Sequence, residues 1–263
     1  RHDASGIAKR TAHDRDIARM LGLGQQDRRR QIGRCGQRDE IDQPGNVVLR
    51  ASGGGHPDVK PQLVPTPLKI TSSSAGITVA WGKSKRVFPA GVDLDVTASE
   101  SAGASSEWLR VGGVRYPGFM TIRPQWNGDA TRLDAIATMP LETYLPGVLT
   151  HELWRDWPRQ AYEMQGVAAR TYALHERGRA RAEGRQWDVE SNINDQMFGG
   201  GTGLVTPNEA VRATRGQILV TDGKPLRAYY SSTCGGRPAS AAKVWPVKSG
   251  YEFNLAPPVQ GKP

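Results

Sequence analysis

The chain has 263 residues, a formal net charge of +9 and a pI of about 9.8. Its length allows one large domain or two modest ones with a sizeable core. It contains no run of about 18 or more apolar residues, which excludes a transmembrane helix from this sequence. The positive charge favours an anionic partner, which on charge alone is a nucleic acid, a membrane surface or a wall polymer bearing carboxylates and phosphates.

Residues 1–62 are dense in Arg, Asp, Gln and Gly and show little sustained apolar periodicity. This composition predicts a disordered or poorly structured basic tail. The alternative is a nucleic-acid-binding arm, but the stretch has no aromatic residue on which a base could stack, so we expect no nucleic-acid partner. The chain starts at Arg1 without the apolar core of a signal peptide, so we expect a fragment that lacks its targeting segment.

Four segments after about residue 63 alternate apolar and polar residues with a period of two, which predicts half-buried strands. These strands cover residues 68–70, 77–81, 92–96 and 119–122. Further along, Pro140 suits the first turn of a short helix, because its missing N–H would have no partner there. Pro146 disfavours a continuous helix, so we expect a break or a new first turn near it.

The strongest helix prediction covers residues 158–182, with Asp156 as its N-cap and Gly184 as its C-terminal stop. Within it, several residues recur at three- and four-residue spacing and are expected to share one face, with Gln165 beside them. They are Ala161, Met164, Ala168, Tyr172 and His175.

A second short helix is predicted at residues 207–214, closed by Gly216. The strands predicted at 217–220 and 226–230 flank Asp222-Gly223, a dipeptide typical of a tight hairpin turn. Strands followed by helices and then a hairpin indicate an α+β fold.

Six short motifs follow one another between about residues 131 and 246. They are Pro140–Val148, His151–Glu152, Gln165–Ala173, Gln196–Gly199, Ala210–Leu219, and Tyr229–Gly236 followed by Trp245. In this order they resemble the stage II sporulation protein D family, also called the SpoIID/LytB or amidase-enhancer family. The resemblance implies a domain over residues 63–263, whose C-terminal edge we expect to be truncated because family members usually continue beyond Trp245.

The resemblance also implies a function. Members of the family are extracytoplasmic enzymes, periplasmic or secreted, that cleave peptide-stripped glycan strands of peptidoglycan as lytic transglycosylases. We expect a strand-rich N-terminal lobe from about residue 65, packed with a helical lobe that carries Glu152, and a substrate groove between them. Other relatives are enhancers of a cell-wall amidase, so the alternative is a non-catalytic wall-binding module that stimulates an N-acetylmuramoyl-L-alanine amidase.

Glu152 stands where the family places its catalytic glutamate. Glycoside hydrolases generally use two carboxylates, whereas a lytic transglycosylase needs one, because the C6 hydroxyl of muramic acid attacks its own anomeric carbon. Trp154 and Trp157 flank Glu152 in the sequence, and apolar contact with their rings is expected to favour the protonated acid. The alternative is an ordinary glutamate at a helix entrance that interacts with the helix dipole.

Further substrate contacts are expected in the matched motifs. Gln165 and Gln196 suit hydrogen bonds to N-acetyl groups, or else satisfy backbone groups of loops. Arg170 suits a substrate carboxylate, or else a buried ion pair with a loop acid. The last motif contributes Tyr230, which suits stacking on a sugar, together with Ser232 and Thr233, unless its glycines simply form a turn.

No cofactor or metal is expected. Arg155 stands where the zinc-peptidase motif H-E-x-x-H needs its second histidine. Some family members hold a zinc ion near the segment that corresponds to residues 187–196, which has no sulfur ligand here, although Asp188 and Asp195 leave a weak cation site open. The two cysteines, Cys35 and Cys234, lie far apart in dissimilar contexts and indicate neither a disulfide framework nor a metal site.

Overall fold

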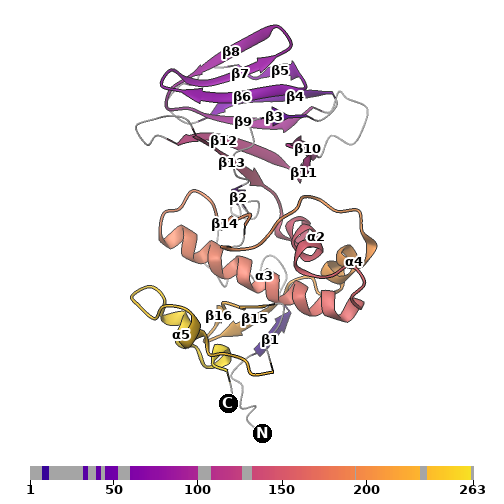
Figure 1. Cartoon of the computed structure of the whole chain (residues 1–263), viewed down its shortest axis with the longest axis vertical. Helices are drawn as coiled ribbons and strands as arrows, with labels where there is room; N and C mark the ends of the chain where they lie inside the picture. The colour runs from indigo at the N-terminus through magenta and orange to yellow at the C-terminus, as the bar shows by residue number, and fades with distance from the viewer. Residues whose placement is uncertain are drawn as a thin grey trace. The chain divides into compact units, whose positions relative to one another are not determined.

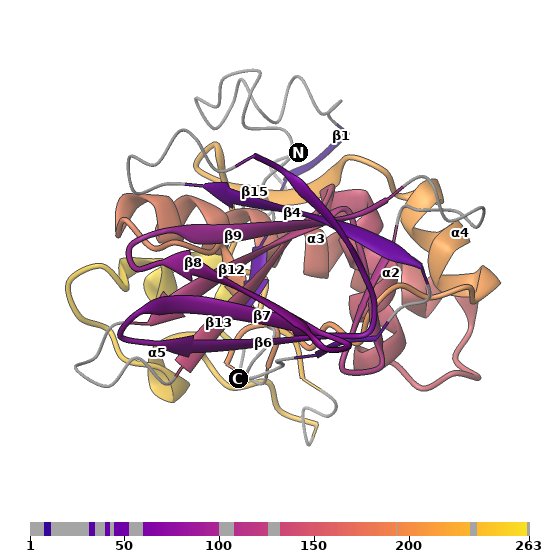
Figure 2. The same cartoon turned by 90° about the horizontal axis from the view of Figure 1, so that it is seen from above.

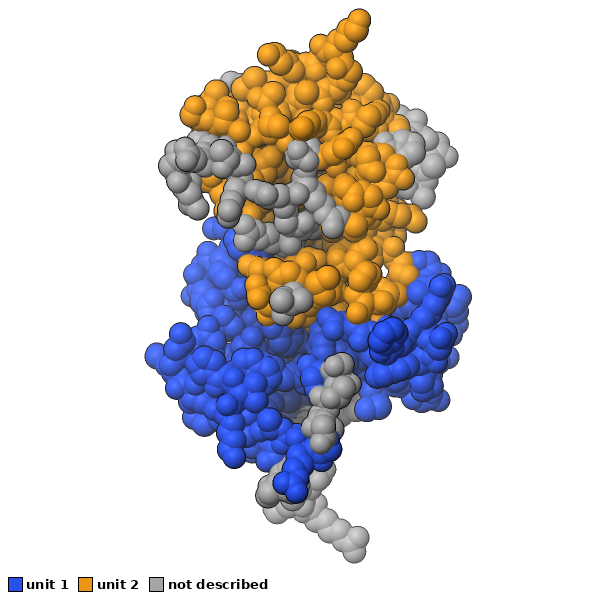
Figure 3. Space-filling model, viewed as in Figure 1, with its two compact units in different colours: residues 1–28, 152–188, 203–263 blue, residues 29–151, 189–202 orange. Residues whose placement is uncertain are grey.

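The protein forms two compact units in the computed structural model, and Figure 3 colours them separately. The strand-rich unit comprises residues 29–151 and 189–202, and the helical unit comprises residues 1–28, 152–188 and 203–263. Strands dominate the first and helices the second, which confirms the predicted α+β class. The structure describes residues 8–11, 32–34, 40–42, 45–52, 60–99, 108–125, 132–192, 194–231 and 236–261.

The described strands of the strand-rich unit form two sheets. The larger sheet has the order β14 (Val189–Glu190), β2 (Ile32–Arg34), β13 (Arg132–Thr138), β12 (Phe119–Gln125), β9 (Asp93–Ala98), β4 (Asn46–Ser52) and β5 (Gln62–Pro65). The other has the order β11 (Val114–Pro117), β10 (Trp108–Val111), β3 (Glu40–Ile41), β6 (Leu68–Ser73), β7 (Gly76–Trp81) and β8 (Ser84–Pro89). Neighbouring strands are antiparallel except β2 and β14, which are parallel.

The core of this unit lies between the two sheets, where β10 contacts β9 and β12, and β6 contacts β13. Figures 1 and 2 show these strands from the side and from above. Period-two alternation sends one set of side chains inward from each strand, as a half-buried strand requires. The inward set includes Leu49, Ile70, Val79, Leu94, Val96, Leu109, Met120 and Ile122, all buried.

The four strands predicted from alternation are confirmed as β6, β7, β9 and β12. Several parts of the predicted tail are corrected, because residues 8–11, 32–34, 40–41 and 46–52 form strands, and the longest of these, β4, pairs with β5 and β9. Val47 and Leu49 of this strand are fully buried. Their apolar alternation is short and surrounded by polar sequence, so the composition of residues 1–62 concealed it.

Helix α2 (Leu141–Glu152) follows β13 and runs through Pro146 without a break. The backbone N–H groups of Thr143 and Tyr144 donate to the Pro140 carbonyl, so Pro140 lies directly before the first residue of the helix, one position ahead of the predicted place in its first turn. The break expected near Pro146 is wrong. The hydroxyl of Thr150 donates to the carbonyls of Pro146 (3.2 Å) and Gly147 (3.1 Å), which adds bonds to this part of the helix.

The helical unit is built on the long helix α3 (Arg159–Ala182), which packs against α4 (Val205–Ala213) and against the sheet that follows it (Figure 1). Its three-stranded antiparallel sheet has the order β1 (Ala8–Thr11), β15 (Gln217–Thr221) and β16 (Lys224–Pro225). The short elements α5 (Ala241–Val244), η3 (Glu252–Leu255) and η4 (Pro257–Val259) follow. None of the helices in the described ranges is both long and apolar enough to cross a membrane.

The ends of these elements largely match the predictions. Gly184 adopts φ +67° just beyond α3, which is the left-handed conformation typical of a helix stop. Asp222 and Gly223, both with positive φ, form the predicted hairpin turn between β15 and β16. The Asp156 N-cap is wrong, because Pro158 occupies that position with no side-chain cap.

The buried face of α3 differs from the predicted one. Met164, assigned to the shared face, is largely exposed, whereas Tyr162, Val167, Ala169 and the charged Arg170 are buried. Spacing alone did not reveal this face because a fully buried arginine lies in it.

Arg170 ties three elements together from inside the helical unit. Its guanidinium donates to the carbonyls of Gly166 in α3 (3.3 Å), Val211 in α4 (3.3 Å) and Gln217 in β15 (3.2 Å). The side chain is fully buried, so its surroundings favour a structural role over the predicted contact with a substrate carboxylate.

Replacing Arg170 with Met would leave these carbonyls without the guanidinium donor, because a thioether cannot donate a hydrogen bond. We expect the free energy of unfolding to fall by about 2–4 kcal/mol. The matched control Arg212→Met alters an exposed arginine of α4 and should change stability by less than about 0.5 kcal/mol. Urea denaturation of both variants measures the difference, and equal stabilities would contradict the structural role.

Candidate functional site

Glu152 is the last residue of α2, and its side chain is half-buried. The sequence interpretation placed it at a helix entrance, and the structure corrects this to a helix C-terminus. The difference matters because the two helix ends carry opposite partial charges. At an entrance the dipole favours the ionised carboxylate, whereas at the C-terminus it disfavours a negative charge.

The two indoles next to Glu152 in sequence are not packed away. Trp154 is 77% exposed and Trp157 is 43% exposed, so neither indole belongs to the core, and contact of their rings with Glu152 stays a prediction. Their loop nevertheless has defined bonds. The backbone N–H of Trp157 donates to the Trp154 carbonyl (3.1 Å), and the hydroxyl of the buried Tyr162 donates to the same carbonyl (3.2 Å).

Within the strand-rich unit, α2 packs closely on the loop that carries the Gln196–Gly199 motif. Gly147 makes this approach possible, because a Cβ there would lie 2.4 Å from the Gly200 carbonyl oxygen and 2.4 Å from the Phe198 ring. Phe198 also stacks on Tyr144, with ring centroids 5.2 Å apart. Two of the motifs recognised in the sequence therefore form one packed structure.

Gln196 and His151 belong to this same contact. Gln196 is fully buried, and the Tyr144 hydroxyl lies 3.4 Å from its Oε1. This burial favours the structural alternative for Gln196 over a direct substrate contact. The exposed His151 ring lies over Gly199, where a Cβ would overlap it, and its Nδ1 is 3.1 Å from the Gly147 carbonyl oxygen.

In the helical unit, α3 holds Gln165 and contacts the segment that carries Tyr230 through its Tyr172 ring. Gln165 is half-buried, and its side-chain Nε2 is a buried donor with no hydrogen-bond partner among the described residues. The Tyr230 ring is half-buried and packs edge-on against Tyr172, with centroids 6.3 Å apart. Ser232 and Thr233 lie outside the described residues, as do Cys35 and Cys234.

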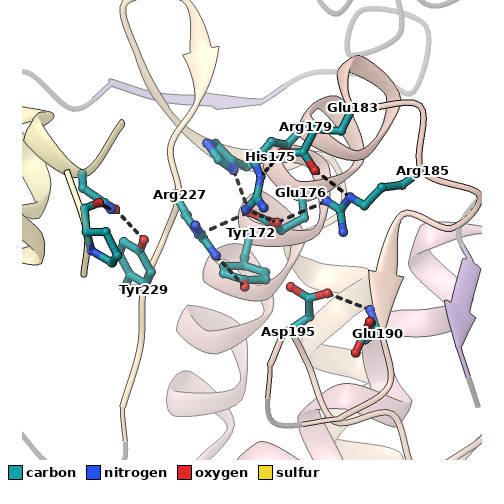
Figure 4. A network of polar contacts seen from close by, with 12 residues as sticks. Tyr172, His175, Glu176, Arg179, Glu183, Arg185, Glu190, Asp195, Arg227 and Tyr229 are labelled. Atoms are coloured by element: carbon teal, nitrogen blue, oxygen red, sulfur yellow. Dashed lines mark hydrogen bonds and ion pairs between the residues drawn. The ribbon is translucent and has the colours of Figure 1, made fainter. Parts of the chain in front are cut away.

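A buried carboxylate organises the centre of this unit, and sequence reasoning missed it. Glu176 of α3 is 1% exposed and lies 2.9 Å from Arg179, 3.2 Å from Arg227, 3.7 Å from Arg185 and 3.0 Å from His175 Nδ1. Figure 4 shows these side chains converging on Glu176. No motif marks the cluster, because four of its members are spaced irregularly within residues 175–185 and Arg227, far along the chain, joins them only in the fold.

The surroundings of Glu176 decide its charge state. Burial alone raises the pKa of a carboxyl group, but the hydrogen bond with His175 and the charges of Arg227 and Arg179 outweigh it. The pKa of Glu176 is therefore lowered from its ordinary value of 4.5. Glu176 is ionised at neutral pH, unlike a proton donor.

The predicted site residues divide between the two units. Glu152, Gln165, Arg170 and Tyr230 belong to the helical unit, whereas Gln196 belongs to the strand-rich unit, so a shared groove stays a prediction of the sequence.

The residues considered for a cation also have protein partners. Asp188 lies 3.8 Å from Arg177, and Asp195 accepts the Glu190 backbone N–H at 2.8 Å. Across the described ranges, no three His, Cys, Asp or Glu side chains gather as a metal site would require. The expectation of no metal stays a prediction.

Comparison with known proteins identifies the segment that contains α2, α3 and α4. Residues 129–220 match the SpoIID family, described as Stage II sporulation protein. The matched residues contain five of the six motifs, and the resemblance to this family that the motifs predicted is confirmed.

Three relatives share parts of the sequence. An uncharacterised protein of Brachyspira hyodysenteriae is 33% identical over 148 residues, which cover 56% of this chain and 39% of that protein. The amidase enhancer of Bacillus subtilis is 34% identical over 101 residues, which cover 38% of this chain and 13% of that protein. Stage II sporulation protein D of Bacillus subtilis is 24% identical over 172 residues, which cover 59% of this chain and 47% of that protein. The chain thus spans less than half the length of each of these relatives.

Replacing Gly147 with Ala tests the contact between α2 and the Gln196–Gly199 loop. An alanine normally stabilises a helix interior relative to glycine by about 0.5–1 kcal/mol. Here the added methyl group would collide with Gly200 and Phe198, so we expect a loss of about 1–3 kcal/mol. The control Gly178→Ala, in an open position of α3, should be stabilising. Thermal unfolding that shifts both variants in the same direction would refute the contact.

The Glu176 cluster predicts a pH-dependent contribution to stability. Because the folded pKa of Glu176 lies below its unfolded value, the stabilisation is present above about pH 4.5 and is lost as the pH falls through the folded pKa. The Glu176→Gln variant should unfold about 3–5 kcal/mol more easily at neutral pH, because it leaves the arginines without their carboxylate. Urea titrations should show this gap shrinking as the pH falls from about 4.5 through the lowered folded pKa of Glu176. A gap that is constant with pH would contradict the assignment.

Proposed function

We propose that the protein is a peptidoglycan lytic transglycosylase and that Glu152 is its acid–base group. The observation that carries the proposal is the position of Glu152. It lies inside the segment that matches the SpoIID family, at the residue where the motifs predict the catalytic acid, and at the C-terminal end of α2. We further propose an extracytoplasmic location, since the substrate is a polymer of the cell wall.

The proposed reaction uses one carboxyl group twice. Glu152 first donates its proton to the glycosidic oxygen that leaves C1 of muramic acid, and the C1–O bond breaks. The C6 hydroxyl of the same sugar then bonds to C1 and gives its proton to the Glu152 carboxylate. The products are a strand with a 1,6-anhydro ring and a strand with a free hydroxyl, and no water is consumed.

The end of α2 supports the first of these steps. The partial negative charge of a helix C-terminus disfavours an ionised carboxylate there by about 0.3–1 kcal/mol. Half-burial of the Glu152 side chain acts in the same direction, because a charged group loses hydration. Each of these two effects, taken alone, opposes ionisation of a carboxyl group.

Other residues of the helical unit suit a glycan. The buried Nε2 of Gln165 has no hydrogen-bond partner in the described part of the chain, and an acetamido oxygen would supply one. Trp154 presents an exposed indole two positions after Glu152, where the apolar C–H face of a sugar can pack. Tyr230, Ser232 and Thr233 stay part of the proposed binding site. Arg170 and Gln196 would act through packing, because both are fully buried.

A second function is favoured by one relative, which is named an amidase enhancer. In that case the chain binds the wall and stimulates a cell-wall amidase without cutting glycan strands. Its basic charge of +9 suits either function, because peptidoglycan carries carboxylates.

The Glu152→Gln variant separates the two functions. An amide cannot donate the proton of a carboxylic acid, so we expect cleavage of peptide-free glycan strands to fall by about 100-fold or more. The control Glu142→Gln alters a half-buried glutamate in the first turn of the same helix and should retain activity. Mass spectrometry of the products measures both the rate and the 1,6-anhydro ends.

Undiminished cleavage by Glu152→Gln would refute the role of Glu152. If wild type stimulates an amidase but releases no anhydro product, and Glu152→Gln behaves in the same way, the enhancer function replaces the enzymatic one.

A further inference from the structure

Trp245 is the outermost of three stacked planar groups in the helical unit, the other two being Tyr229 and the guanidinium of Arg227. Its indole lies on the Tyr229 ring with centroids 3.9 Å apart and an angle of 8° between the planes. The guanidinium of Arg227 lies 5.0 Å from the centre of the same Tyr229 ring. Trp245 nevertheless stays 41% exposed.

The stack is held from below by hydrogen bonds and charge. The hydroxyl of Tyr229 donates to Asn254 Oδ1 at 2.5 Å, and the Asn254 amide donates to the Pro246 carbonyl at 2.8 Å. Arg227 in turn is paired with the buried Glu176. The segment after Trp245 is held through Pro246, and on the other side the Trp245 backbone N–H donates to the Ala241 carbonyl at 2.9 Å. The indole is therefore a pre-formed surface and needs little ordering on binding.

The surface around Trp245 is apolar and basic. Val244 and Val247 are exposed beside it, as are Lys243 and Lys248. Residues 236–261 hold three cationic side chains, Arg237, Lys243 and Lys248, and one carboxylate, Glu252, which gives a net charge of +2. An exposed apolar patch with a basic rim is typical of a binding site for an anionic ligand that has an apolar face.

We propose that Trp245 is a stacking platform for a sugar ring of a glycan strand whose carboxylates meet Lys243 and Lys248. A pyranose presents C–H groups on one face, which pack on an indole, and hydroxyl groups at its edge, which stay hydrated. The lactyl or peptide carboxylates of peptidoglycan supply the negative charge. The ligand class rests on the proposed function, whereas the platform itself rests on the geometry of the stack.

Binding of two glycans to the whole chain tests the proposal by isothermal titration calorimetry. One is a peptide-free peptidoglycan strand, which bears lactyl carboxylates, and the other is a neutral chito-oligosaccharide of similar length. Trp245→Ala should lower the affinity for both glycans by about tenfold, because the stacking surface is lost. Trp245→Phe should retain part of the affinity, because it keeps a ring.

The lysines should behave differently. The double variant Lys243→Gln and Lys248→Gln should lower the affinity for the anionic strand several-fold and leave the affinity for the neutral oligosaccharide unchanged. The loss of affinity should fade at high salt. Val87→Ala, which alters an exposed valine of β8, is the matched control and should bind both glycans like wild type. Urea denaturation checks that each variant is folded. If Trp245→Ala does not fold, Trp245→Phe with reduced affinity and unchanged stability supports the platform.

The inference is overturned if folded Trp245→Ala binds both glycans like wild type, even if it no longer binds an amidase. That last result would assign the surface to a protein partner. If only Trp245→Phe folds, binding of both glycans like wild type by that variant overturns the inference. Glu152→Gln distinguishes this proposal from the proposed function. If wild type and Glu152→Gln bind strands equally and neither cuts them, the enzymatic function fails while the platform stands.

Discussion

The helical unit depends on the partners of two charged residues of α3 that are buried in its interior, Arg170 and Glu176. A buried arginine or glutamate without partners would be more costly than the stability of most domains can bear, so the partners of Arg170 and Glu176 fix the rest of the unit. Arg170 is bonded to carbonyls of α3, α4 and β15. Glu176 holds Arg227, which supports Tyr229 and through it Trp245. Side chains of α3 therefore hold the core of the unit together, position Arg227 and Tyr229, and through Tyr229 support the exposed Trp245.

A second constraint acts at the end of α2. Gly147 lets the helix approach the 196–201 loop closely, and Phe198 fills the space beside Tyr144. This packing belongs to the strand-rich unit, and the helix it anchors ends at Glu152. A helix end placed in this way is a reasonable location for an acid that must be protonated before it acts, because the dipole there opposes ionisation.

The sequence predicted the elements whose signals are local. Period-two alternation located β6, β7, β9 and β12, and Asp222-Gly223 located the hairpin. It did not predict the Glu176 cluster or the burial of Arg170, because both depend on residues that are distant in sequence and become neighbours only on folding. Nor did it predict the exposure of the Trp154 and Trp157 indoles, since position in the sequence does not decide which side chains are buried. Family resemblance located Glu152, but the helix end on which it lies came from the structure.

In the proposed reaction a single carboxyl group at the end of α2 cleaves a glycan strand by internal attack, so water takes no part. Digestion of peptide-free strands by the wild-type chain in water enriched with heavy oxygen tests this. Every new muramic acid end should be a 1,6-anhydro ring without heavy oxygen. Heavy oxygen at the anomeric carbon of these ends would identify hydrolysis and refute internal attack.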